Sequence, residues 1–133
     1  MCLYKDKKHH PFNRPLMAKE DIVCYKVLRI NYITNVFVTL YTYSIVPKEY
    51  LKNKVSFKAE ILNKFRFICR HVLGLSNIVT DGFIHTYLSE PPYYGLRFCE
   101  CVFKCIIPKG TKYFIGEHGD YASEQIIFVE QLV

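Results

Sequence analysis

The stretch from Cys101 to Phe128, CVFKCIIPKGTKYFIGEHGDYASEQIIF, carries the pattern that decides the fold. A run rich in β-branched and aromatic residues meets the turn sequence Pro108–Gly110, where proline and glycine favour a tight reversal. A second run, Lys112–Ile115, leads through a glycine-containing loop into a final run, Gln125–Val129. The stretch therefore predicts strand, turn, strand, loop and strand.

Four strands are predicted from β-branched and aromatic runs across the rest of the chain and at the start of this stretch. They cover Ile22–Ile30, Val36–Val46, the FIHTYL run at Phe83–Leu88 that follows a turn at residues 80–82, and Arg97–Ile107. One helix is predicted at Ser56–Leu73, where large apolar residues recur at the spacing of one helical face. The predicted fold class is α+β: a strand-dominated single domain with one main helix.

Length and composition indicate one globular domain. A chain of 133 residues buries enough surface to fold alone, and half of its residues are hydrophobic. Residues 1–20 are basic and contain two prolines, so we expect an irregular N-terminal arm before a single α+β domain at residues 21–133. No apolar leader and no apolar run of membrane length is visible, so we expect a cytoplasmic protein without membrane contact.

The positive charge is concentrated in the first half of the chain. Residues 1–70 carry 14 Lys and Arg against 5 Asp and Glu, whereas residues 71–133 carry 4 against 7. This asymmetry fits a solvated lysine-rich surface, and it also fits binding of a nucleotide, a nucleic acid or an acidic protein. The side chains that would form such a basic patch are Lys48, Lys52, Lys54, Lys58, Arg66 and Arg70.

Three cysteines close in sequence, Cys99, Cys101 and Cys105, do not have the geometry of a metal site. Alternate residues of a strand lie about 6.5–7 Å apart, whereas zinc requires each sulfur about 2.3 Å from the metal. Cys101 and Cys105 share a strand face with Phe103 and Ile107, so we expect their thiols in the apolar core. No metal and no other cofactor is predicted.

His85 is the histidine with the most suggestive surroundings. It precedes two hydroxyl-bearing residues, Thr86 and Tyr87, in a predicted strand. A polar group buried on a strand needs partners or water. His85 could therefore line a cleft, or it could be a hydrogen-bonded strand histidine with a structural role.

Three fragments, in order, resemble the core of the arginine-serine-glutamate class of ADP-ribosyltransferases. That family carries Y-R-G on a first strand, G-F-x-S-T-S on a second, and P-x-G-T followed by E-x-E. The corresponding fragments here are VCYKV at Val23–Val27, GFIHTY at Gly82–Tyr87, PKGT at Pro108–Thr111 and YASEQI at Tyr121–Ile126. The resemblance implies a split sheet with a nucleotide-binding cleft.

The resemblance also implies which residues line that cleft. They are Tyr25, Lys26, His85, Thr86, Tyr87 and Glu124. Lys26 stands where the family has its phosphate-binding arginine, so it keeps the charge and loses the bidentate fork. His85 and Tyr87 stand where the family has serines, and Ile126 stands where it has the catalytic second glutamate. The resemblance therefore implies the fold and the cleft without the family's standard chemistry, and no catalytic residue is assigned.

The chain also resembles small proteins carried by phages and mobile elements of gut bacteria, through MCLY at its start, GFIHTY, KCIIPKGTKYF and YAS. That setting implies host interaction or counter-defence. Three functions are expected in turn. The first is a non-catalytic module with a degenerate cleft that binds a nucleotide, a nucleotide-derived ligand or another anion. The second is a divergent ADP-ribosyl-transferring or NAD-cleaving enzyme that uses His85 and Glu124. The third is a basic inhibitor that binds nucleic acid or protein.

Overall fold

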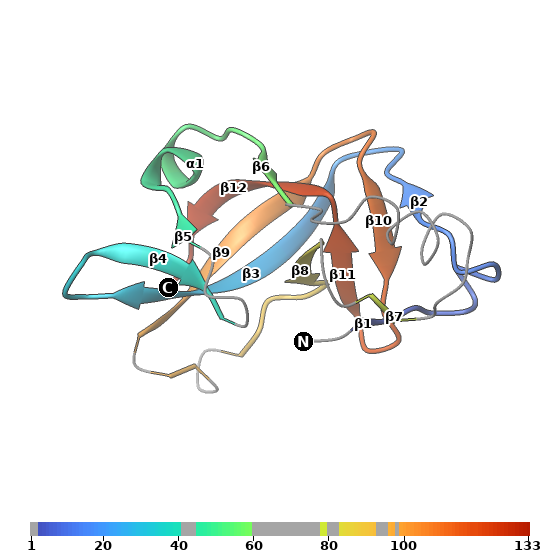
Figure 1. The fold of residues 1–133 in the computed structure, drawn as a ribbon, viewed down its shortest axis with the longest axis horizontal. Coiled ribbons are helices and arrows are strands. Elements are labelled where there is room, and N and C mark those ends of the chain that lie inside the picture. Colours follow the sequence, from blue (N-terminus) through green and yellow to red (C-terminus); the bar gives the residue numbers. More distant parts are fainter. Residues whose placement is uncertain (1–2, 41–44, 60–77, 80–82, 93–95, 98) are drawn as a thin grey trace.

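The computed structural model describes residues 3–40, 45–59, 78–79, 83–92, 96–97 and 99–133 (Figure 1). Within them, strands dominate and the one helix is short. The elements are β1 (Leu3–Tyr4), β2 (Leu16–Met17), β3 (Ile22–Asn31), β4 (Val36–Thr39), β5 (Ile45–Val46), α1 (Lys48–Lys52), β6 (Phe57–Lys58), β7 (Ile78–Val79), β8 (Ile84–Tyr87), β9 (Glu100–Ile107), β10 (Lys112–Ile115), β11 (Asp120–Ser123) and β12 (Gln125–Gln131).

β3 lies at the centre of a ten-stranded antiparallel sheet. Eight of the strands follow the order β2-β10-β11-β8-β3-β9-β12-β6, and the other two are β4, which pairs with β3, and β5, which pairs with β4. β9 pairs along one edge of β3 from Ile22 to Arg29. The other edge is shared, because β8 pairs with it at Tyr25 alone and β4 pairs with it from Leu28 to Asn31. The sheet therefore forks at β3, and the two branches diverge in Figure 1. A separate two-stranded sheet joins β1 and β7.

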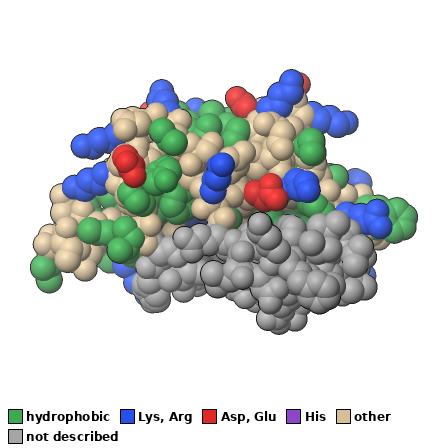
Figure 2. All heavy atoms as spheres, turned by 45° about the horizontal axis from the view of Figure 1, so that its top comes forward, with side chains coloured by type: hydrophobic (Ala, Val, Ile, Leu, Met, Phe, Trp, Pro, Cys, Tyr) green, Lys and Arg blue, Asp and Glu red, His purple; other side chains and the backbone are tan. Residues whose placement is uncertain are grey.

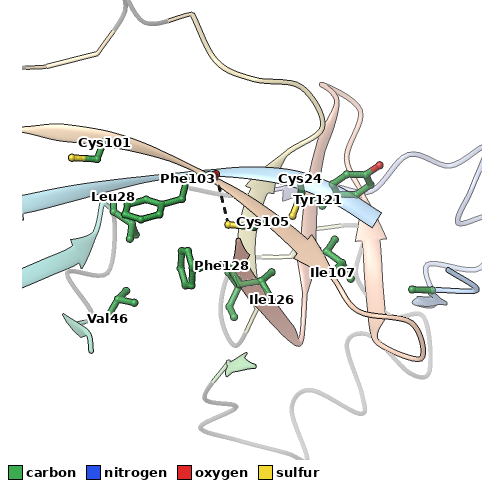
Figure 3. Close-up of a cluster of buried hydrophobic side chains, with 12 residues drawn as sticks. Cys24, Leu28, Val46, Cys101, Phe103, Cys105, Ile107, Tyr121, Ile126 and Phe128 are labelled. Atoms are coloured by element: carbon green, nitrogen blue, oxygen red, sulfur yellow. Dashed lines mark hydrogen bonds between the residues drawn. The ribbon is translucent and has the colours of Figure 1, made fainter. Parts of the chain in front are cut away.

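One face of the sheet carries the main apolar core, to which β3, β9 and β12 contribute alternate side chains (Figure 3). The ring of Phe103 makes edge-to-face contacts with Phe37 and Phe128, at centroid distances of 5.5 and 5.6 Å. Such ring pairs add about 0.5–1.5 kcal/mol each to the stabilisation from burial. Cys101 and Cys105 lie in this core, so the prediction that they pack as small hydrophobic side chains is confirmed.

The opposite face carries a smaller cluster of buried side chains at the β8–β11–β10 end of the sheet. Its members are Leu3, Phe83, Phe114 and Ala122. Phe114 of β10 is directly opposite Ala122 of β11, so the two side chains share a face. The chain segment before β3 is held against this cluster by Leu3, which is fully buried.

Most strands predicted from the sequence are confirmed, and their bounds are close. The predicted Ile22–Ile30 run is β3, and Lys112–Ile115 is β10 with the same ends. The Pro108–Gly110 reversal is present, and Gly110 has a φ of 87°, a left-handed conformation that glycine adopts without strain. The strand predicted at Arg97–Ile107 begins three residues later, at Glu100.

The predicted single strand Val36–Val46 is wrong, because the chain reverses within it. β4 and β5 pair with each other in an antiparallel hairpin, with Phe37 opposite Val46. No glycine or proline occurs between residues 36 and 46 to mark the turn. A continuous run of strand-forming residues therefore concealed a hairpin whose connection at residues 41–44 lies outside the described residues.

The predicted helix Ser56–Leu73 is wrong at its start, and residues 60–73 lie outside the described residues. Phe57 and Lys58 form β6, which pairs with β12 at Gln125 and Ile126. The ring of Phe57 packs on Phe128 at a centroid distance of 6.1 Å, so burial in the core overrides the helical pattern. The helix within the described residues, α1, has only five residues, which is too short for a periodic apolar stripe.

Two further differences concern segments predicted to be irregular. Residues 1–20 contribute β1 and β2, and they bury Lys5 and His10. Residues 120–123, within the predicted glycine-containing loop, form β11, all of whose side chains are buried. No helix among the residues that the structure describes has both the length and the apolar character needed to cross a membrane.

Gly116 precedes the β10–β11 turn at a position with no room for a side chain. A Cβ atom there would lie 2.8 Å from Cγ of Asp120 and 2.9 Å from Cγ of Leu3. Both neighbours are buried, so they cannot swing into solvent. We expect Gly116→Ala to lower the free energy of unfolding by about 1–3 kcal/mol through overpacking, measured by urea denaturation.

Gly110→Ala is the matched control, because open space surrounds that position and only its positive φ opposes a side chain. It should cost about 1 kcal/mol. Adding Asp120→Ala to Gly116→Ala should recover part of the loss, because it removes the nearest obstacle. An unchanged stability in Gly116→Ala would show that the Asp120 side chain has another position to occupy.

Candidate functional site

The residues predicted to line one cleft do not share one face of the sheet, because some project from one face and some from the other. Tyr25 of β3 is directly opposite Tyr87 of β8, so both side chains share one face. His85 lies two residues before Tyr87 and shares that face, because side chains alternate along a strand. Lys26 and Thr86 are the next residues along each strand, so their side chains project from the other face.

Lys26 lies where β8 separates from β3, and its ammonium has a structural partner. Nζ donates a hydrogen bond of 2.8 Å to the backbone carbonyl of His85. Burial lowers the pKa of Lys26 to about 8, while the nearby Cys105 and Cys24 thiols act in the opposite direction. The Lys26 ammonium thus binds the His85 carbonyl at the fork, where β3 and β8 are paired only at Tyr25 and Tyr87.

The two thiols beside Lys26 are not poised for chemistry. Cys24 and Cys105 are directly opposite each other on β3 and β9, and both are fully buried. Burial raises the pKa of Cys24 to about 11 and raises that of Cys105 further. Because the thiolate is the reactive form, both side chains remain neutral and inert. The Thr86 hydroxyl lies beside the Cys24 thiol on the same face.

Tyr25, His85 and Tyr87 lie on the face of the smaller cluster, where the structure adds residues that the sequence did not indicate. Lys104 of β9 is directly opposite Tyr25, and Asp120 of β11 is directly opposite Tyr87. Asp120 is buried, and burial raises the pKa of its carboxyl. Its position in an apparent loop between Gly119 and Tyr121 gave no signal in the sequence.

Glu124 lies at the other end of β8 from the tyrosine pair. Ser123, its neighbour in β11, is opposite Ile84, whereas Asp120 is opposite Tyr87. Glu124 is half-buried, and its backbone carbonyl accepts a hydrogen bond of 2.7 Å from the N–H of Ala59. Ile126 is fully buried in the main core. The strands therefore do not bring Glu124 together with Tyr25 and Tyr87.

Three of the residues predicted to form a basic patch are accessible to solvent. Lys52, Lys54 and Lys58 are exposed along the segment from α1 to β6, whereas Arg66 and Arg70 lie outside the described residues. Figure 2 shows Lys and Arg side chains spread around the visible face among hydrophobic ones, without one dense cluster. The described lysines therefore offer local charge along one segment of the chain.

A groove of about 300 Å³ lies between the β3–β4 hairpin, α1 and the end of β12. We call it the lysine groove. Its floor is apolar and consists of Ile30, Phe37, Leu51 and Phe103. Its rim is polar and consists of Lys48, Lys52, Asn35 and Gln131. Lysines four residues apart on a helix lie on the same side, so both ammonium groups of α1 can reach over the floor.

No metal site is evident in the described part of the chain, where no three His, Cys, Asp or Glu side chains gather. Comparison with known proteins adds no further constraint on the site: no family model, no curated protein and no solved structure matches this chain. The candidate site is therefore defined by geometry alone, and the lysine groove is a hollow lined by described residues.

Proposed function

We propose that the protein is a non-catalytic binding module for a nucleotide or nucleotide-derived ligand, and that the lysine groove holds this ligand. The observation that carries the proposal is the pair Lys48 and Lys52 on the rim above an apolar floor. A nucleotide has the complementary chemistry, because its flat base is apolar on both faces and its phosphate is anionic. The proposal includes a degenerate ADP-ribosyltransferase-like split sheet, which rests on the resemblance of the sequence fragments.

The charge on the rim is not neutralised within the described part of the chain. Both lysines are exposed, and no described side chain forms an ion pair with either of them; ion pairs elsewhere in the described part of the chain include His9 with Asp6 and Arg29 with Glu100. Two ammonium groups one helical turn apart repel each other modestly. A phosphate between them removes that repulsion and gains two charge-assisted hydrogen bonds.

The size and the lining of the groove favour a small ligand that is held and not transformed. Ligand pockets range from about 300 to about 1,000 Å³, so a groove of about 300 Å³ suits a mononucleotide better than a dinucleotide. No His, Asp, Glu or Cys is among the residues that line it. General acid–base catalysis most often uses a histidine or a carboxylate within hydrogen-bond reach of the substrate, so the lining supports binding better than turnover.

The direct test is titration of the full chain with AMP and ADP, followed by calorimetry and by mass analysis of the mixture. We expect saturable binding with intact ligand. Exposed ionic contacts are worth about 0.2–1 kcal/mol each, so Lys48→Ala plus Lys52→Ala should weaken binding about tenfold. Raising the salt concentration should weaken wild-type binding in the same direction, because solvent-exposed charges are screened.

The matched control is Lys54→Ala plus Lys58→Ala, which removes two exposed lysines that do not line the groove. It should bind as the wild type does. Equal losses in both pairs would replace the proposal with a diffuse basic surface for nucleic acid or protein. Loss in His85→Ala or Lys26→Ala with the groove variants unaffected would move the site to the fork. Release of nicotinamide from NAD would favour the divergent enzyme. A role in phage–host counter-defence rests on the fragment resemblance and follows only if a ligand is found.

A further inference from the structure

The segment before β3 covers the outer edge of β10 along its whole length. β2 pairs with Lys112 and Tyr113, and the backbone N–H of Asp6 donates to the carbonyl of Ile115 at 2.9 Å. Lys5 forms an isolated bridge with Gly116. These contacts occupy backbone groups that would otherwise form an open sheet edge, which is a ready template for another strand.

One backbone N–H on the edge of β10 is hydrogen-bonded to a side chain and not to another backbone group. The N–H of Ile115 donates to Nε2 of His10 at 2.8 Å, while Nδ1 of the same ring lies 2.8 Å from the carbonyl of Arg14. A carbonyl can only accept, so Nδ1 carries the proton, and an amide N–H can only donate, so Nε2 is bare. The ring is therefore neutral, with both nitrogens engaged, and His10 is 1% exposed.

The groups around His10 make a positive charge on its ring unfavourable, because the Lys5 ammonium is already close. Lys5 is buried, donates to the carbonyl of Asn13 at 2.8 Å and lies 4.5 Å from the centroid of the Phe114 ring. The His10 ring packs on the same Phe114 ring at 5.3 Å. Asp6 and His9, the other titratable groups close to His10, form an exposed pair with each other at 2.9 Å.

Burial is the largest influence on His10, and it lowers the pKa of the ring below its ordinary value. The Arg14 carbonyl and Asp6 act in the opposite direction, and Lys5 and His9 lower the pKa further. The pKa of His10 is lowered while the segment before β3 lies on the β10 edge, so the ring binds protons more readily when that segment has left the edge. The contribution of neutral His10 to holding the segment on the β10 edge is therefore complete above the ordinary histidine pKa of about 6.5, and it weakens as the pH falls below that value.

We propose that residues 3–18 are a proton-releasable cover of the β10 edge, with His10 as the group that protonation turns from acceptor to donor. A proton on Nε2 removes the acceptor for the Ile115 N–H and places two N–H groups face to face. It also puts a second cation beside Phe114 and Lys5. Release leaves the backbone groups of β10 unpaired, in the form that accepts an extended strand from a partner.

The test is hydrogen exchange of the full chain from pH 7.5 to pH 5.0, corrected for intrinsic exchange rates and resolved by peptide. Protection within residues 3–18 and 112–116 should fall by up to about tenfold per pH unit below about pH 6.5, because one proton is taken up. Peptides from β3 and β9 should keep their protection. If all peptides lose protection together, the acid transition is global and the proposal is overturned.

His10→Gln is the variant that isolates the proton. A glutamine amide oxygen can accept from the Ile115 N–H and does not titrate in this range, so the pH dependence should disappear. His9→Gln is the matched control, because His9 is exposed, and it should keep the dependence. A pH response that survives in His10→Gln overturns the proposal.

A second measurement needs no variant and covers the case in which His10→Gln does not fold. NMR titration of the wild-type histidines should show His10 titrating below its ordinary value. The amide signal of Ile115 should move with the same midpoint. Titration at the ordinary value, with the Ile115 amide unmoved, overturns the proposal.

Discussion

Replacing Ile126 with glutamate is expected to destabilise the protein strongly and not to create an active site. The Ile126 side chain is fully buried in the main core, and Phe57 of β6 is directly opposite it. An unpaired carboxylate at such a position costs more than about 4 kcal/mol. Domains of this kind have total stabilities of about 5–15 kcal/mol. Thermal unfolding followed by circular dichroism should therefore show a large fall in the melting temperature at neutral pH.

Ile127→Glu separates this effect from a general intolerance of β12 to charge. Ile127 is half-buried and projects from the opposite face, so its replacement should cost about 1 kcal/mol. If Ile126→Glu instead folds as well as Ile127→Glu and releases nicotinamide from NAD, the fragment resemblance extends to the catalytic position and the binding-module proposal fails.

Truncation of Phe103 is expected to cause the second-largest loss of stability. Its ring is 3% exposed and contacts both Phe37 and Phe128 edge-to-face. Removing a buried phenylalanine ring costs about 3–5 kcal/mol, part of which comes from the cavity that remains. We expect Phe103→Ala to shift the urea midpoint by that amount without a change in the denaturant slope.

Two variants calibrate this result. Phe103→Leu keeps most of the apolar volume and should cost about 1 kcal/mol. Phe37→Ala removes the other ring of the same contact from a half-buried position and should cost less than Phe103→Ala. A loss in Phe103→Ala no larger than that in Phe37→Ala would contradict the central position of the Phe103 ring in the core.

The central strands could be predicted because their residues carry strong local signals. β3 is dense in β-branched and aromatic residues, and β10 stands between a Pro-Lys-Gly turn and a glycine. Elements without such signals were missed. α1 follows Pro47 and spans one turn and a half, and β11 has polar residues at both ends. Their conformations depend on burial against neighbours that are distant in sequence.

The candidate site could not be predicted from fragments because each fragment specifies residues and not the face they occupy. Tyr25 and Lys26 are adjacent in sequence, yet the pleat directs them to opposite faces of the sheet. The lysine groove was missed for a different reason. Its floor brings together Ile30, Leu51 and Phe103 from three distant segments, and no local pattern records that meeting.

The pairing of β3 with β9 has a consequence for biosynthesis. Tyr25 finds its partner Lys104 only in the last third of the chain, and synthesis proceeds from the N-terminus. A nascent chain on the ribosome therefore carries residues 22–27 of β3 without their β9 partners until most of the protein has been made, while β4 can already pair with Leu28–Asn31. Unpaired apolar strands self-associate, and charges within them oppose this. Lys26 and Arg29 supply such charges in the segment IVCYKVLRIN, so we expect them to oppose self-association of the unfinished protein.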